Sequence, residues 1–310
     1  MARILRIRYN FRMVELIGHS ELLATKTIVV TGAGRGIGAA IARDTAAHGA
    51  NVVVSDVDVD RAHLTAQQIR DGGGVAQARQ VDVSDWSSVA ELVEATVADF
   101  GSLDGMVCNA GRFSMGPMED STPAMWEEMI GTNLLGVAIC GQTAARRMLT
   151  QGSGAIVTVT SGAQCGMPAM SVYGATKGAV ASLTYTWALE LGPRGIRVNA
   201  MSPMADTRLM DVNREYRAQY PGGEQLPSQP APEANAPVVT FLLSDLARDV
   251  NGQVVRINGG DLALMSRPAV LSPVLRRDVW TPETIAEAFH TQLVSEQPSL
   301  RVVDASRSRS

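Results

Sequence analysis

The sequence predicts an α/β fold in which helices cover both faces of one parallel sheet. From Lys26 onward, short apolar runs alternate with longer helical stretches. The apolar runs are hydrophobic along nearly their whole length, which is typical of strands buried on both faces. A glycine-rich turn follows the first run and leads directly into a helix. Together these observations predict a single doubly wound sheet of the Rossmann type.

The individual elements follow from composition and length. The expected strands are short, apolar and rich in β-branched residues, and they lie at residues 27–30, 51–55, 75–81, 106–108, 155–160, 196–200 and 254–257. The expected helices are longer and often Ala-rich, and they lie at residues 37–48, 58–70, 89–100, 125–149, 171–191 and 236–243. Residues 202–237 interrupt the alternation and are rich in Pro and Gly. A loop of this length predicts a functional lid or a disordered segment, with a solvated linker as the alternative.

Charge, hydropathy and cysteine usage exclude several classes of function. The net charge is −4, and the first dozen residues are Arg-rich and positively charged. The body of the chain is therefore strongly acidic, which makes it unsuited to binding nucleic acid. No apolar run reaches the ~18 residues of a membrane span, so we expect no membrane association. The three cysteines form neither a CxxC pair nor a disulfide framework, which indicates a reducing, cytoplasmic setting. No metal site is predicted.

The turn after the first strand reads TGAGRGIG over residues 31–38. Glycine lets a backbone approach a pyrophosphate closely, and the following helix N-terminus offers unpaired N–H groups. The strand–turn–helix context therefore predicts a dinucleotide site, whereas the spacing of the glycines alone would also fit an ordinary tight turn.

An acidic residue ends the second strand. Asp56 lies 18 residues after Gly38, where a carboxylate can hydrogen-bond the adenosine ribose and repel a 2′-phosphate. This position favours NAD. Arg35 acts in the opposite direction because a guanidinium can pair with a 2′-phosphate, so NADP stays as the alternative. A solvated carboxylate without a ligand is the other interpretation of Asp56.

Tyr173 and Lys177 lie four residues apart at the start of an expected helix and share one face. The chain holds five tyrosines and only two lysines, Lys26 and Lys177, so this pairing is unlikely to arise by chance. A phenol has an ordinary pKa of ~10, and a nearby ammonium lowers it. The phenol can then exchange a proton with an alcohol or carbonyl oxygen. The alternative is a surface pair without a function.

These motifs, taken in series, resemble the short-chain dehydrogenase/reductase family over about residues 26–261. The matching segments are TGAGRGIG with Gly32, Gly36 and Gly38, Asn109-Ala110-Gly111, Asn133, Ser161, Tyr173 with Lys177, Arg197-Val198-Asn199-Ala200 with Ser202-Pro203, Thr207, and Asn258-Gly259-Gly260. The resemblance implies hydride transfer between a nicotinamide cofactor and an alcohol or ketone, in a homo-oligomer that is a dimer or tetramer.

The resemblance also implies roles for single residues. Tyr173 would be the general acid/base, Lys177 would hold the nicotinamide ribose, and Ser161 would hydrogen-bond the substrate oxygen. Asn133 would hold a water that links Lys177 to solvent. The remaining residues that would contact the cofactor are Gly32, Arg35, Gly36, Ile37, Gly38, Asp56, Asp82, Val83, Asn109, Pro203 and Thr207.

Three features depart from the family pattern. Ser161 lies 12 residues before Tyr173 where 13 is common, so Thr160 is the alternative hydroxyl donor. Met204 follows Pro203 where Gly is usual, which would change how the loop leaves the sheet. Residues 262–310 extend beyond the usual end of the family.

We therefore expect three segments. Residues 1–25 would be an N-terminal extension, disordered in part; its first 12 residues could instead precede a true start at Met13 or target the chain. Residues 26–261 would form the dinucleotide-binding catalytic domain. Residues 262–310 would hold one helix over 281–293, with Thr281 as N-cap and Pro282 at the first helical position, and a disordered tail.

The predicted function is that of an oxidoreductase that prefers NAD and acts on a bulky, apolar secondary alcohol or ketone. The expected substrate wall is rich in methionine, which suits a flexible apolar pocket or, equally, fills a core: Met115, Met118, Met167, Met170, Met204 and Met210. The alternatives are an NADP-linked enzyme resembling 3-oxoacyl-acyl-carrier-protein reductases and a non-catalytic nucleotide-binding protein on the same scaffold.

Overall fold

The computed structural model describes residues 21–206, 216, 229–293 and 295. These residues divide into two compact units, one that ends at Leu264 and one that begins at Met265.

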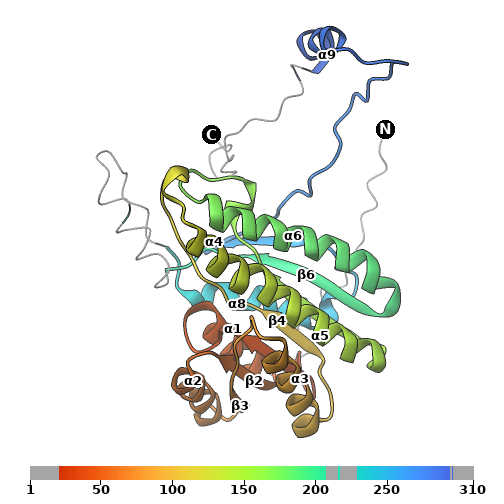
Figure 1. The fold of residues 1–310 in the computed structure, drawn as a ribbon. Helices are drawn as coiled ribbons and strands as arrows, with labels where there is room; N and C mark the ends of the chain where they lie inside the picture. Colours follow the sequence, from red (N-terminus) through yellow and green to blue (C-terminus); the bar gives the residue numbers. More distant parts are fainter. Residues whose placement is uncertain (1–20, 207–215, 217–228, 294, 296–310) are drawn as a thin grey trace. The chain divides into compact units, whose positions relative to one another are not determined.

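The first unit is built on one sheet of eight strands (Figure 1). The strands are β1 (Thr27–Thr31), β2 (Asn51–Asp56), β3 (Val75–Gln80), β4 (Gly105–Cys108), β5 (Gly154–Val159), β6 (Ile196–Ser202), β7 (Val254–Asn258) and β8 (Asp261–Leu264). Their spatial order is β3-β2-β1-β4-β5-β6-β7-β8. All neighbours pair in parallel except β7 and β8, which are antiparallel. The predicted α/β fold of the Rossmann type is confirmed.

Helices follow the strands in the expected alternation. They are α1 (Gly36–Ala47), α2 (Val59–Asp71), α3 (Trp86–Phe100), α4 (Pro123–Met129), α5 (Gly136–Gln151), α6 (Ser171–Leu191), α8 (Ala236–Leu243) and, in the second unit, α9 (Pro282–Ala288). Short 3-10 turns include Gly162–Cys165 after β5 and Pro232–Asn235 before α8.

Two apolar layers fill the spaces between sheet and helices. Ile28 and Val30 of β1 pack into the layer that holds α1, α2 and α8. Val29, which points to the opposite face, packs into the layer that holds α3, α5 and α6. This alternation along a strand buried on both faces explains why the strand sequences are apolar throughout.

The expected helix 125–149 contains a change of geometry. α4 and α5 are joined by a π-helical segment, Ile130–Leu135, in which Asn133 is fully buried. A π-helical turn places one extra residue in the helix and is frequent at functional sites. Apolar periodicity alone does not reveal such an insertion.

Two edges of the first unit differ from expectation. Leu23, within the predicted N-terminal extension, is buried in the core, and its amide donates to the His48 carbonyl at 2.8 Å. β8 was not predicted because its four residues carry no extended apolar alternation. Leu262 and Leu264 of β8 are 67% and 65% exposed.

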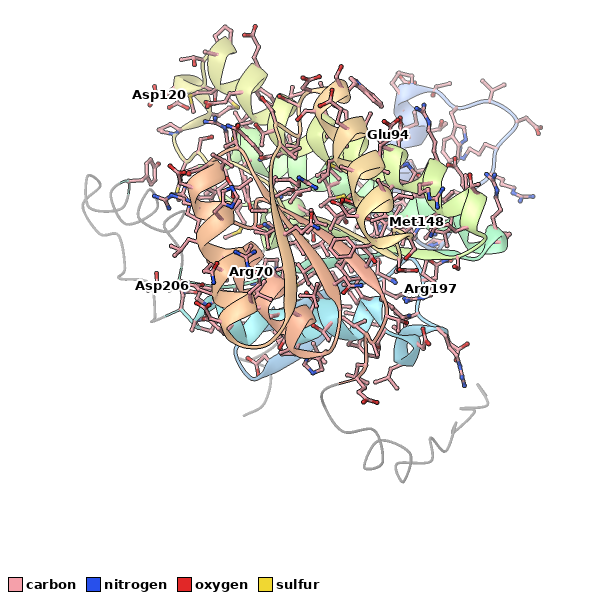
Figure 2. The ribbon with its side chains drawn as sticks, turned by 90° about the horizontal axis from the view of Figure 1, so that it is seen from below. Arg70, Glu94, Asp120, Met148, Arg197 and Asp206 are labelled. Carbon is pink, nitrogen blue, oxygen red and sulfur yellow. The ribbon has the colours of Figure 1, made fainter. Side chains whose placement is uncertain are left out.

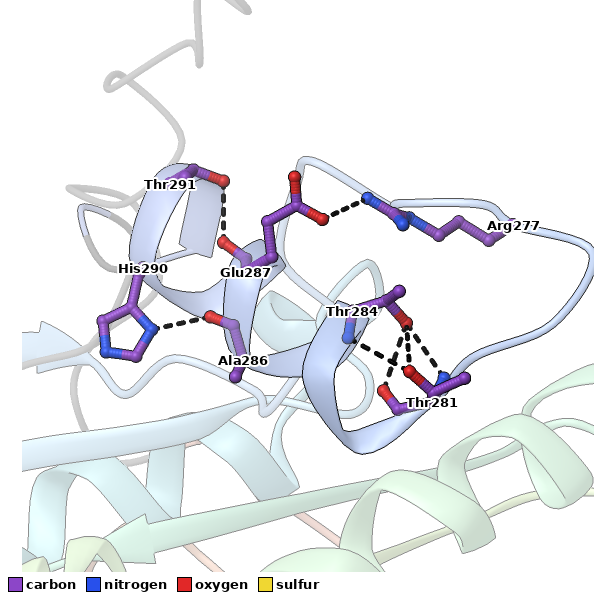
Figure 3. A network of polar contacts seen from close by, with 7 residues as sticks. All are labelled: Arg277, Thr281, Thr284, Ala286, Glu287, His290 and Thr291. Atoms are coloured by element: carbon purple, nitrogen blue, oxygen red, sulfur yellow. Dashed lines mark hydrogen bonds and ion pairs between the residues drawn. The ribbon is translucent and has the colours of Figure 1, made fainter.

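The second unit is a short segment around α9. Thr281 is the N-cap of α9 and Pro282 is at the first helical position, as the sequence predicts, and Thr284 completes a capping box with Thr281. Arg277 pairs with Glu287 at 2.8 Å (Figure 3). Arg277 also lies 5.5 Å from the ring centre of Trp280. α9 ends at Ala288, and a π-helical turn continues to Leu293.

The ends of the strands define two sides of the first unit. Asp120 and Asp206, which follow β4 and β6, lie on one side, and Met148 and Arg197 lie on the opposite side (Figure 2). The side with Asp120 and Asp206 is the carboxyl end of the sheet, where ligands of open α/β sheets bind.

Candidate active site

The loops after β1 and β4 meet where the strand order changes direction. The Thr31 hydroxyl accepts hydrogen bonds from the Asn109 and Ala110 amides at 3.1 and 3.2 Å. Asn109 in turn donates from Nδ2 to the carbonyls of Thr31 and Gly32 at 2.9 and 3.0 Å. Asn109 therefore fastens the two loops together at the point where such sheets bind dinucleotides.

The glycine turn is held by contacts that leave no room for side chains. Gly32 and Gly36 have φ of 61° and 58°, in the left-handed region. A Cβ on Gly38 would lie 2.3 Å from the Gly32 carbonyl oxygen and 2.4 Å from Asn109 Nδ2. α1 can therefore approach β1 closely only with glycine at position 38.

The N-terminus of α1 is open to an anion. Arg35, its N-cap residue, makes no capping hydrogen bond through its side chain, and the first turn holds no acidic residue. By contrast, the side chains of Asp58, Asp85 and Thr122 cap α2, α3 and α4. A pyrophosphate would satisfy the open amides at α1, so the turn fits a dinucleotide.

Asp56 is oriented toward this turn by two backbone amides. Its Oδ2 accepts from the Gly34 amide at 2.8 Å, and its Oδ1 accepts from the Asp58 amide at 3.0 Å. The carboxylate thus lies at the entrance of the glycine turn, whereas the Arg35 side chain is exposed.

Asp82 and Val83 follow β3 and lie in different surroundings. Ser84 donates to Asp82 Oδ1 from its amide and its hydroxyl at 2.9 and 2.6 Å. These hydrogen bonds lower the pKa of Asp82, and the charge of Arg112 contributes the least to the lowering. Val83 is buried, and its Cγ2 would lie 2.7 Å from a Cβ on Gly136.

Ser161 and Tyr173 are brought together by the turn after β5. Their side chains are hydrogen-bonded, and this bond lowers the pKa of the phenol, although burial raises it by more. Thr160 instead donates its buried hydroxyl to the Met201 carbonyl at 3.2 Å. The shortened spacing between Ser161 and Tyr173 therefore still places Ser161, rather than Thr160, beside the phenol.

Lys177 is the buried cation of the site. It is 4% exposed, its Nζ donates to the Val159 carbonyl at 2.7 Å, and it lies 5.7 Å from the Tyr173 ring centre. Burial lowers the pKa of Lys177 to about 8. The sequence predicts that Lys177 lowers the pKa of Tyr173, whereas the net direction for the phenol is upward because burial dominates.

Asn133 lies next to the cation and is fully engaged by the loop after β4. Its Oδ1 accepts from the Arg112 amide at 2.7 Å, and its Nδ2 donates to the Arg112 carbonyl at 2.9 Å. A Cβ on Gly111 would lie 3.4 Å from Asn133 Oδ1 and 3.7 Å from Lys177 Nζ. The π-helical segment, the loop and α6 therefore converge at this point.

Several residues near the predicted catalytic side chains carry no sequence motif. Phe113 packs its ring edge-to-face on Tyr173 with ring centres 4.9 Å apart. The Gly116 amide donates to the Ala169 carbonyl at 2.8 Å and joins the loops after β4 and β5. No motif marks these contacts, because they depend on loops that meet only in the folded chain.

The methionines of the expected wall differ in exposure. Met118 is 72% exposed and Met167 is 39% exposed, whereas Met170 is buried. Met115 and Met204 are half-buried, and Met210 lies outside the described residues.

The chain leaves β6 through a backbone held by two side chains. The Pro203 carbonyl accepts from Arg256 Nη1 at 3.2 Å. Asn235, fully buried, accepts from the Met204 amide at 3.3 Å and donates to its carbonyl at 3.1 Å. This clamp holds the backbone where the family pattern has glycine. Thr207, predicted to contact the cofactor, lies outside the described residues.

Comparison with known proteins agrees with this geometry. The family profile described as enoyl-(acyl carrier protein) reductase matches residues 32–261. The chain is also 42% identical, over 253 residues, to cis-4-hydroxycyclohexanecarboxylate dehydrogenase of Sinomonas cyclohexanicum; the match covers 79% of this chain and 99% of that protein. The chain belongs to the short-chain dehydrogenase/reductase family.

Other members of the short-chain dehydrogenase/reductase family match at similar length. L-rhamnose 1-dehydrogenase (NAD(P)(+)) of Azotobacter vinelandii is 39% identical, with 77% of this chain and 97% of that protein covered. A 3-oxoacyl-[acyl-carrier-protein] reductase of Staphylococcus aureus is 38% identical, with 76% and 98% covered. The crystal structure of a short chain dehydrogenase from Mycobacterium avium matches with a TM-score of 0.78 at 30% identity, covering 89% and 97%.

Membership of the short-chain dehydrogenase/reductase family fixes the broad activity. The protein is an NAD(P)-dependent oxidoreductase that acts on CH–OH groups, with an alcohol or ketone as substrate. Within the described part of the chain, no helix is long and apolar enough to cross a membrane. In the same residues, no group of three or more His, Cys, Asp or Glu side chains is arranged to hold a metal ion.

Proposed function

We propose that the protein is an NAD-preferring dehydrogenase or ketoreductase for a bulky, largely apolar secondary alcohol or ketone. The observation that carries this proposal is the pairing of the Ser161 and Tyr173 side chains above a buried Lys177 ammonium. A hydroxyl, a phenol and a cation in this order can bind and protonate one carbonyl oxygen.

In the proposed mechanism, Ser161 and Tyr173 hydrogen-bond the reacting oxygen together. Tyr173 donates a proton to the oxygen during reduction and accepts it during oxidation. Lys177 holds its charge close to the phenol, which favours the phenolate produced by reduction. When bound, the nicotinamide ring supplies or accepts the hydride, while the protein contributes orientation and proton transfer.

Asn133 has a supporting role in this proposal. Its side chain holds the loop that follows β4 beside Lys177. Asn133 lies in a π-helical segment, a geometry that is frequent at functional sites. A water there would connect Lys177 to solvent and replace the proton that Tyr173 gives up.

The preference for NAD rests on Asp56. Its carboxylate is fixed by the Gly34 amide at the entrance of the glycine turn, where it would hydrogen-bond ribose hydroxyls and repel a 2′-phosphate. The glycine turn with Arg35, Ile37 and Gly38 would bind the pyrophosphate. Asp82 and Val83 would flank the adenine, Asn109 would hold the loop against the cofactor, and Pro203 with Thr207 would lie near the nicotinamide.

The proposed substrate class follows from the apolar side chains around the phenol. Phe113 covers Tyr173, and the buried Met170 begins the turn that leads into α6. Such surroundings favour an alicyclic or acyl group over a sugar. The 42% identical relative, named for a hydroxycyclohexanecarboxylate substrate, supports a ring-containing alcohol.

A second candidate function has one specific observation in its favour. Arg35 is exposed beside the glycine turn and could pair with a 2′-phosphate. This geometry, together with the Staphylococcus aureus relative, favours an NADP-linked reductase of 3-oxoacyl groups on acyl carrier protein. The other alternative from the sequence, a nucleotide-binding protein without turnover, is disfavoured by the family match and by the presence of Ser161, Tyr173 and Lys177.

We further propose that residues 26–261 form the catalytic domain between two extensions, and that the chain works as a cytoplasmic dimer or tetramer. Leu135, the last residue of the π-helical segment, and Leu189, near the end of α6, are 51% and 64% exposed, and burial of such residues between subunits would favour assembly. Light scattering coupled to size-exclusion chromatography tests the assembly; a monomer at working concentrations would contradict it.

The function is tested by measuring hydride transfer at 340 nm over a panel of alicyclic, acyl-thioester, sugar and short-chain alcohols and ketones, each with NAD(H) and NADP(H). We expect turnover of alicyclic substrates with a higher kcat/KM for NAD(H). A preference for NADPH with acyl thioesters would favour the second candidate. Cofactor binding without turnover of any panel member would contradict an enzymatic role on these substrates.

A further inference from the structure

Thr176 lies at the junction of the three segments that form the site, yet no motif or proposed role includes it. It follows Tyr173 by three residues on α6 and directly precedes Lys177. Its side chain is 2% exposed. A hydroxyl buried this deeply must satisfy its hydrogen-bonding groups inside the protein.

The partners of the Thr176 hydroxyl define its orientation. Oγ1 donates to the Tyr173 carbonyl at 2.8 Å, within the first turns of α6. Because its proton is used there, Oγ1 is left to accept, and Asn133 Nδ2 donates to it at 3.3 Å. The hydroxyl therefore bridges the backbone of Tyr173 and the side chain of Asn133.

The Arg112 backbone fixes which way the Asn133 amide faces, and this orientation directs Nδ2 toward Thr176. Nδ2 has two oxygen acceptors, the Arg112 carbonyl and Thr176 Oγ1, while Oδ1 accepts from the Arg112 amide. A flipped amide would set two donors against each other at Arg112 and two acceptors against each other at the Arg112 carbonyl. Thr176 thus contributes one of the contacts that hold the π-helical segment in register with α6.

We infer that Thr176 is a positioning residue for proton transfer, which acts by holding Asn133 and the first turns of α6 in one arrangement. The inference rests on the proposed roles of Tyr173, Lys177 and Asn133. Thr176 itself is not proposed to contact the reacting oxygen, because its hydroxyl donates to the Tyr173 carbonyl and accepts from the Asn133 side chain. Its effect is therefore on how well the phenol and the ammonium are aligned, because small displacements of positioned groups cost rate.

The test compares Thr176→Val, which removes the hydroxyl at nearly constant volume, with Thr176→Ser, which keeps it. In α6, Thr184 is a matched control: it is fully buried and donates to the Val180 carbonyl at 2.9 Å and pairs with Thr158 at 2.7 Å. Thr184→Val therefore removes a buried hydroxyl of the same helix two turns away from the site.

For the kinetics, we expect Thr176→Val to lower kcat by about 10- to 100-fold, with a smaller change in KM and a displaced pH profile of kcat. Thr176→Ser should restore most of the rate, and Thr184→Val should leave kcat and its pH profile unchanged. Wild-type kcat and pH profile in Thr176→Val, or equal losses in both valine variants, would overturn the inference.

A second readout does not need turnover. The chain has only two lysines, so lysine labelled with 13C at Cε gives two resonances, and Lys26→Arg assigns the one from Lys177. We expect the Lys177 resonance and its titration midpoint to move in Thr176→Val and to stay at wild-type values in Thr184→Val and Thr176→Ser. Unchanged resonances in Thr176→Val overturn the inference, whether or not the wild-type protein turns over a panel substrate. If the Lys177 resonance moves in Thr176→Val but the wild-type protein is inactive on every panel substrate, only the proposed function is overturned.

Discussion

The glycine turn after β1 and the proposed reacting centre at the start of α6 achieve precise placement in opposite ways. The turn is made of backbone: Gly38 allows α1 to touch the Gly32 carbonyl, and Asn109 fastens the adjoining loop. The reacting centre is made of side chains, with Ser161 on Tyr173 and Lys177 on the Val159 carbonyl. Substitutions should therefore damage folding and cofactor binding in the first region but chemistry in the second.

The largest expected effect is on chemistry. Tyr173→Phe removes the proposed proton donor and keeps the ring that Phe113 packs against. We expect kcat to fall about 10²- to 10⁴-fold, with NADH affinity and far-UV circular dichroism retained. Tyr185→Phe, the same change about 18 Å further along α6, should leave kcat unchanged.

If Tyr173→Phe kept its turnover, the phenol would not be the acid/base. If it lost cofactor binding as well, the reacting centre would share the structural role that we assign to the glycine turn, and the contrast between the two regions would fail.

The second prediction uses the buried charge of Lys177. Its pKa is lowered by burial from the ordinary 10.5 to about 8, so between these values the unfolded chain binds a proton that the folded chain has released. The free energy of unfolding should therefore rise with pH from about 8 toward 10.5, and below pH 8 the full cost of burying the charge remains. The rise is at most roughly 3–4 kcal/mol, at about 1.4 kcal/mol per pKa unit.

Lys177→Met tests this linkage by urea unfolding without cofactor between pH 7 and pH 10. The variant should gain stability relative to wild type at pH 7, and the advantage should shrink as the pH rises. Lys26→Met, the change at the other lysine, should keep the wild-type slope. A slope that is identical in wild type and Lys177→Met would show that Lys177 keeps its proton in the folded protein.

The sequence predicts a feature well when residues close together in the chain determine its geometry. The glycine spacing and the Tyr173–Lys177 pair are visible because a turn of fixed shape and one helical turn are set within a few residues. By contrast, the sequence predicts an ordinary helix at Asn133, whereas the structure has a π-helical segment there whose Asn133 side chain contacts Arg112, 21 residues earlier in the chain.

Residues that act between segments escaped prediction for the same reason. Asn235 clamps Met204, Phe113 covers Tyr173, and Thr176 bridges to Asn133, each across a wide gap in the chain or without a motif. The strand β8 was missed because Asp261–Leu264 is short and exposed, so that its pairing with β7 rather than its own pattern defines it. Contacts between distant segments determine these side-chain and strand positions, and no local sequence pattern predicts them.

The close packing of α1 on β1 at the glycine turn gives the third prediction. Gly38→Ala places a Cβ 2.3 Å from the Gly32 carbonyl oxygen, which must shift or push α1 away from β1. We expect a loss of about 1–3 kcal/mol in the free energy of unfolding and weakened binding of NADH. Gly178→Ala, within α6, is the matched control, because its Cβ would lie 3.8 Å from the Gln164 carbonyl oxygen, an ordinary van der Waals distance.

Gly178→Ala should raise stability by up to ~1 kcal/mol through helix propensity. Urea unfolding gives both values. Equal stability of Gly38→Ala and wild type would mean that the close approach of α1 is not needed for folding.

The smallest expected effect concerns the choice of cofactor, which we assign to one side chain beside the glycine turn, that of Asp56. Asp56→Asn keeps an oxygen for the Gly34 amide and removes the charge. Without repulsion of the 2′-phosphate, the ratio of the Kd for NADPH to the Kd for NADH should fall about 10-fold, or roughly 1.4 kcal/mol. Asp60→Asn, an equal change of charge on the exposed first turn of α2, should leave the ratio at its wild-type value.

Fluorescence titration at constant ionic strength measures both ratios, because screening would otherwise hide part of the effect. An unchanged ratio in Asp56→Asn would mean that the carboxylate shapes the turn through its Gly34 hydrogen bond without discriminating between cofactors. The glycine turn would then be built entirely by backbone and local hydrogen bonds, and the exposed Arg35 of the turn itself would be the next residue to test for a preference between the nucleotides.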